Sequence, residues 1–213
     1  MRRRWMLPAC VVSLVLLADQ FIKYAVKTNL CLRESVEIAP WFQIFFTENE
    51  GMAFGMDFIG TAFLTIFRLL AVSLFLWLLA KAVRRGLPAG LLVCISLIVA
   101  GAAGNIVDNC FYGLIFSEST PYQVATLVPF GEGYGSFLAG RVVDMFYFPL
   151  FRWPDWMPLV GGDTFFGAVF NFADACISCG AVALLLFYPR YLYANKGGAE
   201  DAVAEDSVEE TPA

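Results

Sequence analysis

Four long apolar stretches alternate with two stretches rich in polar and aromatic residues along the chain. The apolar stretches cover residues 5–25, 58–80, 86–107 and 164–189. Because about 20 apolar helical residues cross a bilayer core, each stretch predicts a transmembrane helix. The third stretch is the cleanest, because residues 86–107 are 22 consecutive uncharged residues. The pattern therefore predicts a membrane protein with four spans.

The two intervening stretches differ from the spans and from each other. Residues 28–57 alternate apolar and polar side chains on both sides of Pro40, which predicts short strands. Residues 109–163 are rich in glycine, proline and aromatic residues, a composition typical of segments that lie along a membrane interface. No internal repeat is visible, which disfavours a transporter built from inverted halves.

Lysine and arginine residues set the predicted orientation, since they accumulate on the cytoplasmic side of membrane proteins. One side of the four predicted spans holds Arg2, Arg3, Arg4, Lys81, Arg84, Arg85, Arg190 and Lys196, and the other holds Lys23, Lys27, Arg33, Arg141 and Arg152. This bias places both termini in the cytoplasm. The fold class predicted is an all-α membrane protein of four transmembrane helices, with a small extracytoplasmic β-rich cradle (28–57) and an interfacial segment (109–163).

The three N-terminal arginines also resemble the start of a secretory signal. The apolar run between them and Cys10 is shorter than the 7–15 residues or so of a signal core, and the apolar run continues past Cys10. The first helix is therefore expected to be retained.

Composition supports the membrane assignment and narrows the chemistry. Hydrophobic residues make up 59% and charged residues 15% of the chain, against about 45–50% and about 25% in soluble domains. The chain has no histidine, which excludes Ser-His, Cys-His and His-metal mechanisms. No basic stripe interleaved with aromatic residues indicates nucleic-acid binding.

The net charge of -5 comes from the C-terminal tail. Residues 197–213 carry six acidic and no basic residues, so the rest of the chain has a net charge of +1. An acidic segment without aromatic residues is expected to be disordered. The predicted organisation is a membrane domain over residues 1–196 and a disordered acidic cytoplasmic tail over residues 197–213.

Polar side chains inside predicted spans are costly and therefore indicate function. Asp19 and Lys23 lie four residues apart on the first helix, in the order that favours an ion pair. We interpret them as a structural pair that orients this helix. Asn105 and Asp108 share one face at the end of the third helix, after small residues that permit close helix packing.

Two further aspartates complete the set of candidate residues. Asp174 lies in the outer half of the predicted fourth span, three residues after Asn171. An ionised carboxylate there needs hydrogen-bond donors or a neighbouring charge. Asp144 follows Arg141 in the outer segment and, taken alone, is an ordinary surface acid.

The six cysteines lie mostly in apolar runs and are interpreted as small buried side chains. Cys176 and Cys179 form a C-x-x-C pattern inside an apolar helix, where an accessible thiolate is not expected. No metal and no cofactor is predicted. Whether Cys31 and Cys110 pair outside the membrane is left open.

Taken together, these motifs resemble the lipoprotein signal peptidases, the signal peptidase II family of bacterial inner membranes. Five motifs appear in family order between residue 5 and about residue 190. They are Asp19-Gln20 with Lys23, Asn49-x-Gly51-x-Ala53-Phe54-Gly55, Gly104-Asn105-x-x-Asp108, Val142-Val143-Asp144, and Phe170-Asn171-x-Ala173-Asp174.

The resemblance implies a role for each motif residue. Asp144 and Asp174 would be the catalytic pair, and Asp19 and Lys23 would stabilise the fold. The supporting or substrate-binding residues would be Asn49, Gly51, Asn105, Asp108, Arg141, Asn171 and Ala173. The implied partners are lipidated prolipoprotein signal peptides and membrane phospholipids, and the protein is expected to act as a monomer in the inner membrane with its active site near the extracytoplasmic face.

The chain departs from the family pattern in two places. The family usually has arginine after the aspartate of its third motif, whereas Asn109 follows Asp108 here. Arg141 is the candidate to supply the missing guanidinium from the other side. An insertion at about residues 114–140 brings in Glu118 and Glu132, which have no family counterpart.

Without histidine, a carboxylate pair is the simplest hydrolytic group available. Two close aspartates share a proton, so one acts as base and the other as acid. The hypothesis is that the pair activates a water to cleave a prolipoprotein before its diacylglyceryl-modified cysteine. A proton-coupled transporter and a non-catalytic assembly or lipid-binding factor are the alternatives, because intramembrane acids also mark proton paths.

Overall fold

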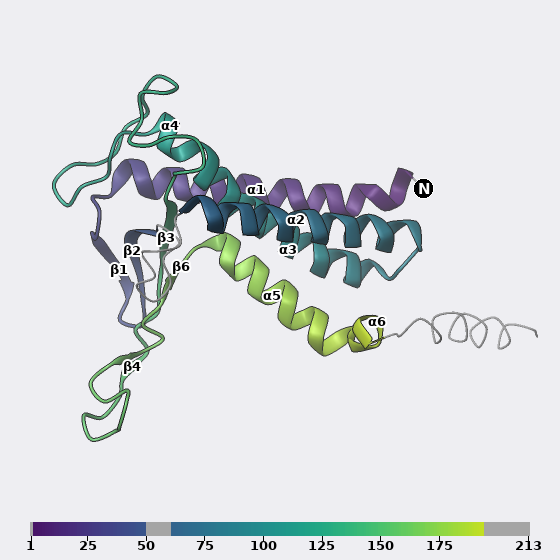
Figure 1. Cartoon of the computed structure of the whole chain (residues 1–213). Coiled ribbons are helices and arrows are strands. Elements are labelled where there is room, and N and C mark those ends of the chain that lie inside the picture. The colour runs from purple at the N-terminus through teal and green to yellow at the C-terminus, as the bar shows by residue number, and fades with distance from the viewer. Residues whose placement is uncertain (1, 50–60, 194–213) are drawn as a thin grey trace, which may run out of the picture.

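The computed structural model describes residues 2–49 and 61–193. Four long helices run roughly alongside one another: α1 (Arg2–Asn29), α2 (Thr61–Arg84), α3 (Ala89–Val107) and α5 (Phe172–Phe187) (Figure 1). α3 packs against the other three helices and is therefore the centre of the bundle. A short helix α6 (Pro189–Tyr193) follows α5.

Three helices among the described residues are long and apolar enough to cross a membrane: Arg3–Asn29, Ile66–Arg84 and Ala89–Ile115. The fourth predicted span, 164–189, starts late, because α5 begins only at Phe172 and has 16 residues. The residues before it form strands β5 (Thr164–Phe165) and β6 (Val169–Phe170). These strands are as apolar in sequence as α5, so hydropathy alone does not separate them from the helix that follows.

α3 continues beyond the predicted end at residue 107. It runs into a π-helical turn, η1 (Asp108–Tyr112), and one further turn, α4 (Gly113–Ile115). Residues 109–115 were expected to lie in the interfacial segment and are instead helical. A π-helical turn changes the direction in which successive side chains point and is frequent at functional sites.

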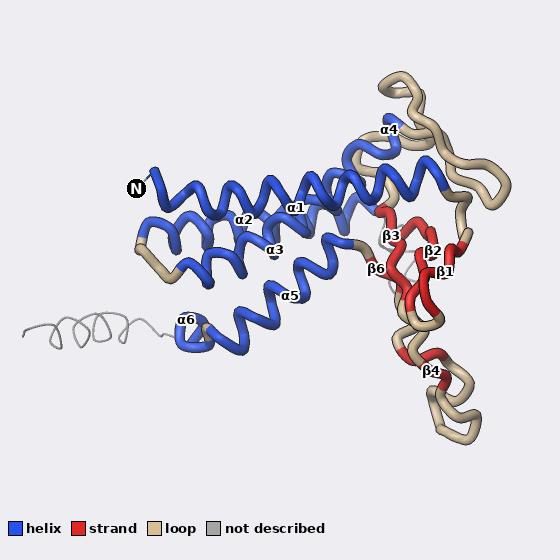
Figure 2. Tube along the Cα trace, turned by 180° about the vertical axis from the view of Figure 1, so that it is seen from behind, coloured by secondary structure: helices blue, strands red, loops and turns tan. Residues whose placement is uncertain are grey.

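A four-stranded antiparallel sheet lies at one end of the bundle, so the fold is not purely helical (Figure 2). Its order is β1 (Ser35–Ala39), β2 (Phe42–Asn49), β3 (Val142–Tyr147) and β6. The predicted strands of residues 28–57 are thus present, with the turn at Pro40. β4 (Phe151–Arg152) pairs with β5 in a second, two-stranded sheet.

Two long segments project from the sheet end of the bundle in opposite directions (Figure 1). Residues 116–140 of the insertion fold over the end of α1 beside α4 (Figure 1). The arm, which we define as residues 148–168, carries β4 and β5 and projects across the direction of the helices. Separate apolar clusters pack the far end of the bundle, around Leu79 and Leu91, and the sheet end, around Phe46 and Met145.

Candidate active site

Asp144 and Asp174 are brought to the sheet end of the bundle by different elements. Asp144 lies on β3, opposite Thr47 of β2, and is almost fully buried. Asp174 lies in the first turn of α5. There the Asn171 side chain accepts from the backbone N–H of Asp174 (2.9 Å), and the Asp174 carboxylate accepts from the Asn171 N–H (3.4 Å). This reciprocal capping box fixes where α5 begins and holds Asp174 at its start.

Two asparagines connect the two carboxyl groups. Asn171 Nδ2 donates to Asp144 Oδ1 at 2.6 Å and to Asn105 Oδ1 at 3.2 Å, while Asn105 Nδ2 donates to Asp174 Oδ1 at 2.9 Å. Asn49 Nδ2 donates to the second oxygen of Asp144 at 3.2 Å. Asp144 and Asp174 therefore belong to one continuous hydrogen-bond network.

The environment raises the pKa of Asp144 to about 7. Burial of the carboxyl group is the largest cause, followed by the charge of Asp174, while the hydrogen bonds from Asn171 and Asn49 act in the opposite direction. A carboxyl that takes up a proton near neutral pH is suited to acid–base chemistry, for which the ideal pKa lies near the working pH.

Lys23 is the only cation at the centre of this network within the described part of the chain. It lies fully buried, with its Nζ 3.0 Å from Asp19 Oδ2, 2.8 Å from Asp108 Oδ2 and 2.8 Å from Asn105 Oδ1. The ammonium thus fixes the orientation of the Asn105 amide, whose oxygen faces Lys23 and whose nitrogen faces Asp174. The predicted Asp19–Lys23 pair is present and reaches the site through Asn105.

Asp19 and Asp108 also accept hydrogen bonds from the backbone of other elements. Asp19 Oδ1 accepts from the backbone N–H of Ala173 at 3.0 Å, which ties α1 to the start of α5. Asp108 Oδ2 accepts from the backbone N–H of Val143 at 3.3 Å, next to Asp144. Gln20, for which no role was predicted, donates to the carboxylates of Asp19 and Asp108 at 3.1 Å and 2.9 Å, respectively.

Two glycines of α3 permit this close approach. A Cβ on Gly101 would lie 2.3 Å from the Ala173 carbonyl oxygen, and one on Gly104 would lie 2.5 Å from Asp19 Oδ2. Side chains here would separate α3 from α1 and α5 and break the contacts described above. The small residues of the third motif are thus explained by packing, as the sequence indicated.

Asn109, at the position where the family usually has arginine, is fully buried and binds the backbone of Gly140, two residues before β3. Its side-chain Nδ2 donates to the Gly140 carbonyl at 2.7 Å, and its backbone carbonyl accepts from the Gly140 N–H at 2.9 Å. A guanidinium does reach this position, but it comes from α2, since Arg68 Nη1 donates to Asn109 Oδ1 at 2.6 Å. Asp108 takes its counter-charge from Lys23.

Arg141 lies in a second polar cluster around Glu48. Its Nη1 is 3.3 Å from Glu48 Oε2 and 3.4 Å from Glu118 Oε1. The other Glu48 oxygen pairs with Lys27 and accepts from Ser119 Oγ at 2.7 Å. The Lys27 ammonium is fully buried and lies over aromatic rings of the insertion. This cluster fastens the insertion to α1 and β2 and flanks the strands that carry Asn49 and Asp144.

Arg68, Glu48 and Ser119 contribute to these contacts although none of them was among the predicted site residues. Arg68 was visible as a lone charge in an apolar span, which is itself a functional signal. Glu48 and Ser119 gave no such signal because both lie in polar surroundings in the sequence. Gly51 and the acidic tail, residues 197–213, lie outside the described residues. All six cysteines are free thiols, so Cys31 and Cys110 do not pair here, and no group of metal-binding side chains is found in the described ranges.

The fold and the site together define an integral membrane protein with two aspartates in a buried polar network. The family model for signal peptidase (SPase) II matches residues 11–189 of the chain. The lipoprotein signal peptidase of Porphyromonas gingivalis is 49% identical over 207 residues, covering 93% of this chain and 91% of that protein. The lipoprotein signal peptidase of Amoebophilus asiaticus is 36% identical over 188 residues, covering 83% and 75%.

The fold agrees with that of solved membrane enzymes. A bacterial membrane enzyme at 22% sequence identity superimposes with a TM-score of 0.56, covering 84% of this chain and 90% of that chain. The chain belongs to the signal peptidase II family, and it is therefore a protease of a bacterial membrane.

Proposed function

We propose that this protease removes the signal peptide from diacylglyceryl-modified prolipoproteins, cutting before the lipidated cysteine, with Asp144 and Asp174 as an aspartic catalytic pair. The observation that carries the proposal is the chain of hydrogen bonds from Asp144 through Asn171 and Asn105 to Asp174. It joins two carboxyl groups from separate elements, in a chain that has no histidine to act as base.

The chemistry follows from one proton shared by the pair. Near neutral pH the raised pKa of Asp144 keeps a proton on the pair, while the charge that remains provides a base. The ionised member takes a proton from a water, which attacks the scissile carbonyl. The protonated member donates to the carbonyl oxygen, and proton transfer to the nitrogen then releases the amine.

The supporting residues set this state. Asn49 and Asn171 donate to Asp144 and so limit how far its pKa rises. Lys23 orients the Asn105 amide, and the amide nitrogen of Asn105 donates to Asp174 Oδ1. The network gathers the acids at the sheet end of the bundle, rather than staging them across the membrane as a proton-coupled transporter requires, and membership of a protease family likewise favours hydrolysis over transport or assembly.

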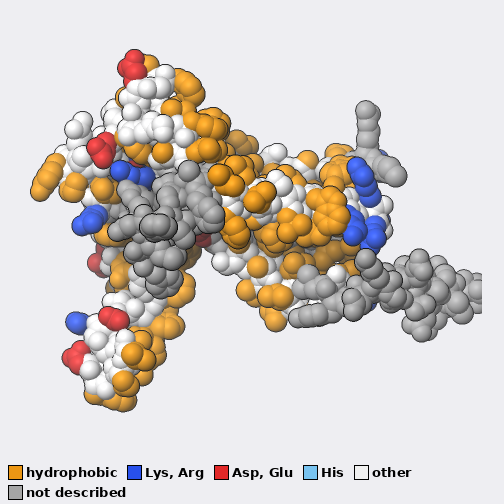
Figure 3. Space-filling view, in the orientation of Figure 1, with side chains coloured by type: hydrophobic (Ala, Val, Ile, Leu, Met, Phe, Trp, Pro, Cys, Tyr) orange, Lys and Arg blue, Asp and Glu red, His pale blue; other side chains and the backbone are white. Residues whose placement is uncertain are grey.

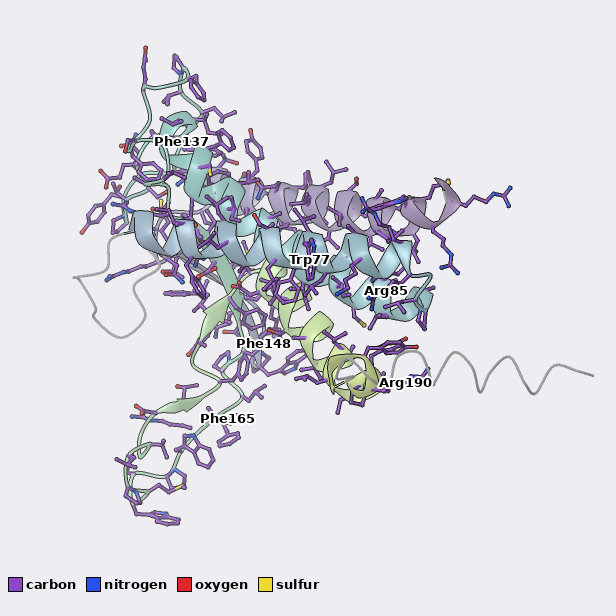
Figure 4. The ribbon with its side chains drawn as sticks, turned by 45° about the vertical axis from the view of Figure 1, so that its right-hand side comes forward. Trp77, Arg85, Phe137, Phe148, Phe165 and Arg190 are labelled. Atoms are coloured by element: carbon purple, nitrogen blue, oxygen red, sulfur yellow. The ribbon has the colours of Figure 1, made fainter. Side chains whose placement is uncertain are left out.

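The proposed setting is the inner membrane, with both termini in the cytoplasm and the site near the extracytoplasmic face. Arg85 and Arg190 lie at the helix ends away from the sheet, which agrees with the positive-inside rule (Figure 4). In this setting α5, continued by α6, acts as the fourth span. The acyl chains of the substrate remain among phospholipids while the scissile bond reaches the pair, and the enzyme works as a monomer.

The test is cleavage of a lipidated precursor by purified Asp144→Asn and Asp174→Asn. We expect each variant to insert normally and to lose cleavage. Asp155→Asn is the matched control, because Asp155 is an exposed acid of the arm and the same substitution there leaves cleavage intact. Cleavage at the wild-type rate by either pair variant would refute the catalytic assignment.

A further inference from the structure

The arm, residues 148–168, exposes large apolar side chains on a two-stranded sheet that extends away from the bundle. Its exposed apolar residues are Leu150, Phe151, Trp156, Leu159, Phe165 and Phe166. Trp156 is 80% exposed and Leu159 fully exposed. An apolar surface of this kind on a projecting element indicates a binding surface.

The arm is two-sided, and its apolar side faces the same way as the membrane-spanning helices. In Figure 3 the hydrophobic side chains of the arm lie toward the helices, and charged side chains lie on the side turned away from them. The only charged residues of the arm are Arg152, Asp155 and Asp163. The arm runs across the helix direction (Figure 1), so its apolar side faces along the length of the membrane-spanning helices.

The backbone of the arm holds apolar side chains outward at a cost. Leu159 and Phe166 adopt positive φ angles of 72° and 61°, a region that bulky side chains rarely occupy, and both side chains are exposed. Leu159, which is fully exposed, gains no apolar contact within the chain in return for this strain. Lipid would supply such a contact.

A chain of ring contacts joins the arm to the sheet that carries the site. Phe151 stacks on Phe165 at 4.7 Å between ring centroids, and Phe165 contacts Phe166 at 6.4 Å. Phe166 meets Phe170 of β6 at 5.9 Å, edge to face, and Phe170 contacts Phe146 of β3, also at 5.9 Å. Asn171 follows Phe170 directly, so this series of contacts connects the arm to a residue of the site.

We propose that the arm docks its apolar side into the lipid interface of the leaflet at the sheet end of the bundle. Its aromatic side chains enter the boundary between head groups and acyl chains, where aromatic residues concentrate. Its charged side remains in water. Through β6 and β3 the arm then sets the depth at which Asp144 and Asn171 meet a lipid-attached substrate. The docking itself depends only on the chain spanning a membrane.

The test is the depth of Trp156 in the full-length protein reconstituted in phosphatidylcholine–phosphatidylglycerol vesicles. The other four tryptophans are replaced by phenylalanine, so that Trp156 is the only reporter. A matched variant also has Trp156→Phe and Asp155→Trp, which moves the reporter to a charged position of the same arm. Fluorescence quenching is measured with acrylamide in the water and with phospholipids brominated at shallow or deep acyl positions.

We expect shallow brominated lipids to quench Trp156 strongly and deep ones weakly, with acrylamide quenching several-fold lower than for the Asp155→Trp reporter. Equal acrylamide quenching of the two reporters would overturn the proposal, as would equal lipid quenching of both. Protection of Trp156 from both kinds of quencher would place it against a second protein chain and would also overturn the proposal. Because the readout is fluorescence, it stands independently of the proposed cleavage chemistry.

Discussion

Asn171 has two separable roles, and replacing it tests both. Asn171→Ala removes the N-cap of α5, which costs about 0.5–2 kcal/mol. It also removes the 2.6 Å hydrogen bond to Asp144, and hydrogen bonds to charged groups are worth about 1.5–3 kcal/mol. The sum predicts a loss of about 2–5 kcal/mol of stability when Asp144 is ionised.

The same hydrogen bond favours the ionised form of Asp144, so its loss raises the pKa further above about 7. Since one pKa unit corresponds to about 1.4 kcal/mol, the shift expected is about one to two units. Loss of the shared proton should end activity at high pH. The alkaline limb of kcat/KM, expected near pH 7 in the wild type, should therefore move to higher pH.

The assay is kcat/KM against pH for a lipidated precursor peptide, together with thermal unfolding of the same samples. Asn171→Ser is the informative companion, because serine still caps the helix while its shorter side chain does not reach Asp144. We expect Asn171→Ser to lose less stability than Asn171→Ala, because it keeps the helix cap, and to show the same shifted alkaline limb. An unshifted limb in both variants, with activity lowered uniformly at every pH, would refute the link between Asn171 and the proton of the pair.

Three further predictions concern the supports of the site. Lys23→Met leaves two buried carboxylates without their cation and should destabilise the protein by about 3–5 kcal/mol, measured as a lower melting temperature. Lys81→Met, on the exposed surface of α2, should leave the melting temperature unchanged. Equal melting temperatures of the two variants would contradict the structural role of Lys23. Gly101→Ala should destabilise by about 1–3 kcal/mol through overpacking against α5, while Gly135→Ala, whose Cβ has ordinary contacts, should be neutral in the same unfolding assay. Glu48→Gln should loosen the insertion and speed its limited proteolysis without changing cleavage within the arm; unchanged proteolysis would show that the cluster does not fasten it.

Hydropathy predicted the helices well because lipid-facing and buried positions of a membrane helix are both apolar. It failed where a segment is apolar for another reason. Residues 164–170 are apolar because they belong to the arm and to β6, and the helix starts at Phe172 because Asn171 caps it. The first span was predicted to end at residue 25, yet α1 continues to Asn29, and the insertion covers the ammonium of Lys27 in its last turn.

The site was predictable as a set of residues and not as a set of contacts. Asp19, Asn105 and Asp174 stood out as polar groups in apolar helices, where every such group needs a partner. Which partner each one finds depends on contacts far apart in the sequence, such as the 2.8 Å bond from Lys23 to Asn105. The contact of Arg68 with Asn109 depends on how α2 packs against α3, and local sequence patterns do not predict this packing.

The central claim is that Asp144 and Asp174 hold one proton between them at neutral pH. The most direct measurement is the infrared C=O stretch of protonated carboxyl groups, followed from pH 4 to pH 9. We predict one component of this band in the wild type that disappears with a midpoint near pH 7. This component should be missing in Asp144→Asn and should titrate at lower pH in Asp174→Asn, because the neighbouring charge is gone. A wild-type protein without a component that titrates near pH 7, or one that neither substitution changes, would contradict the claim.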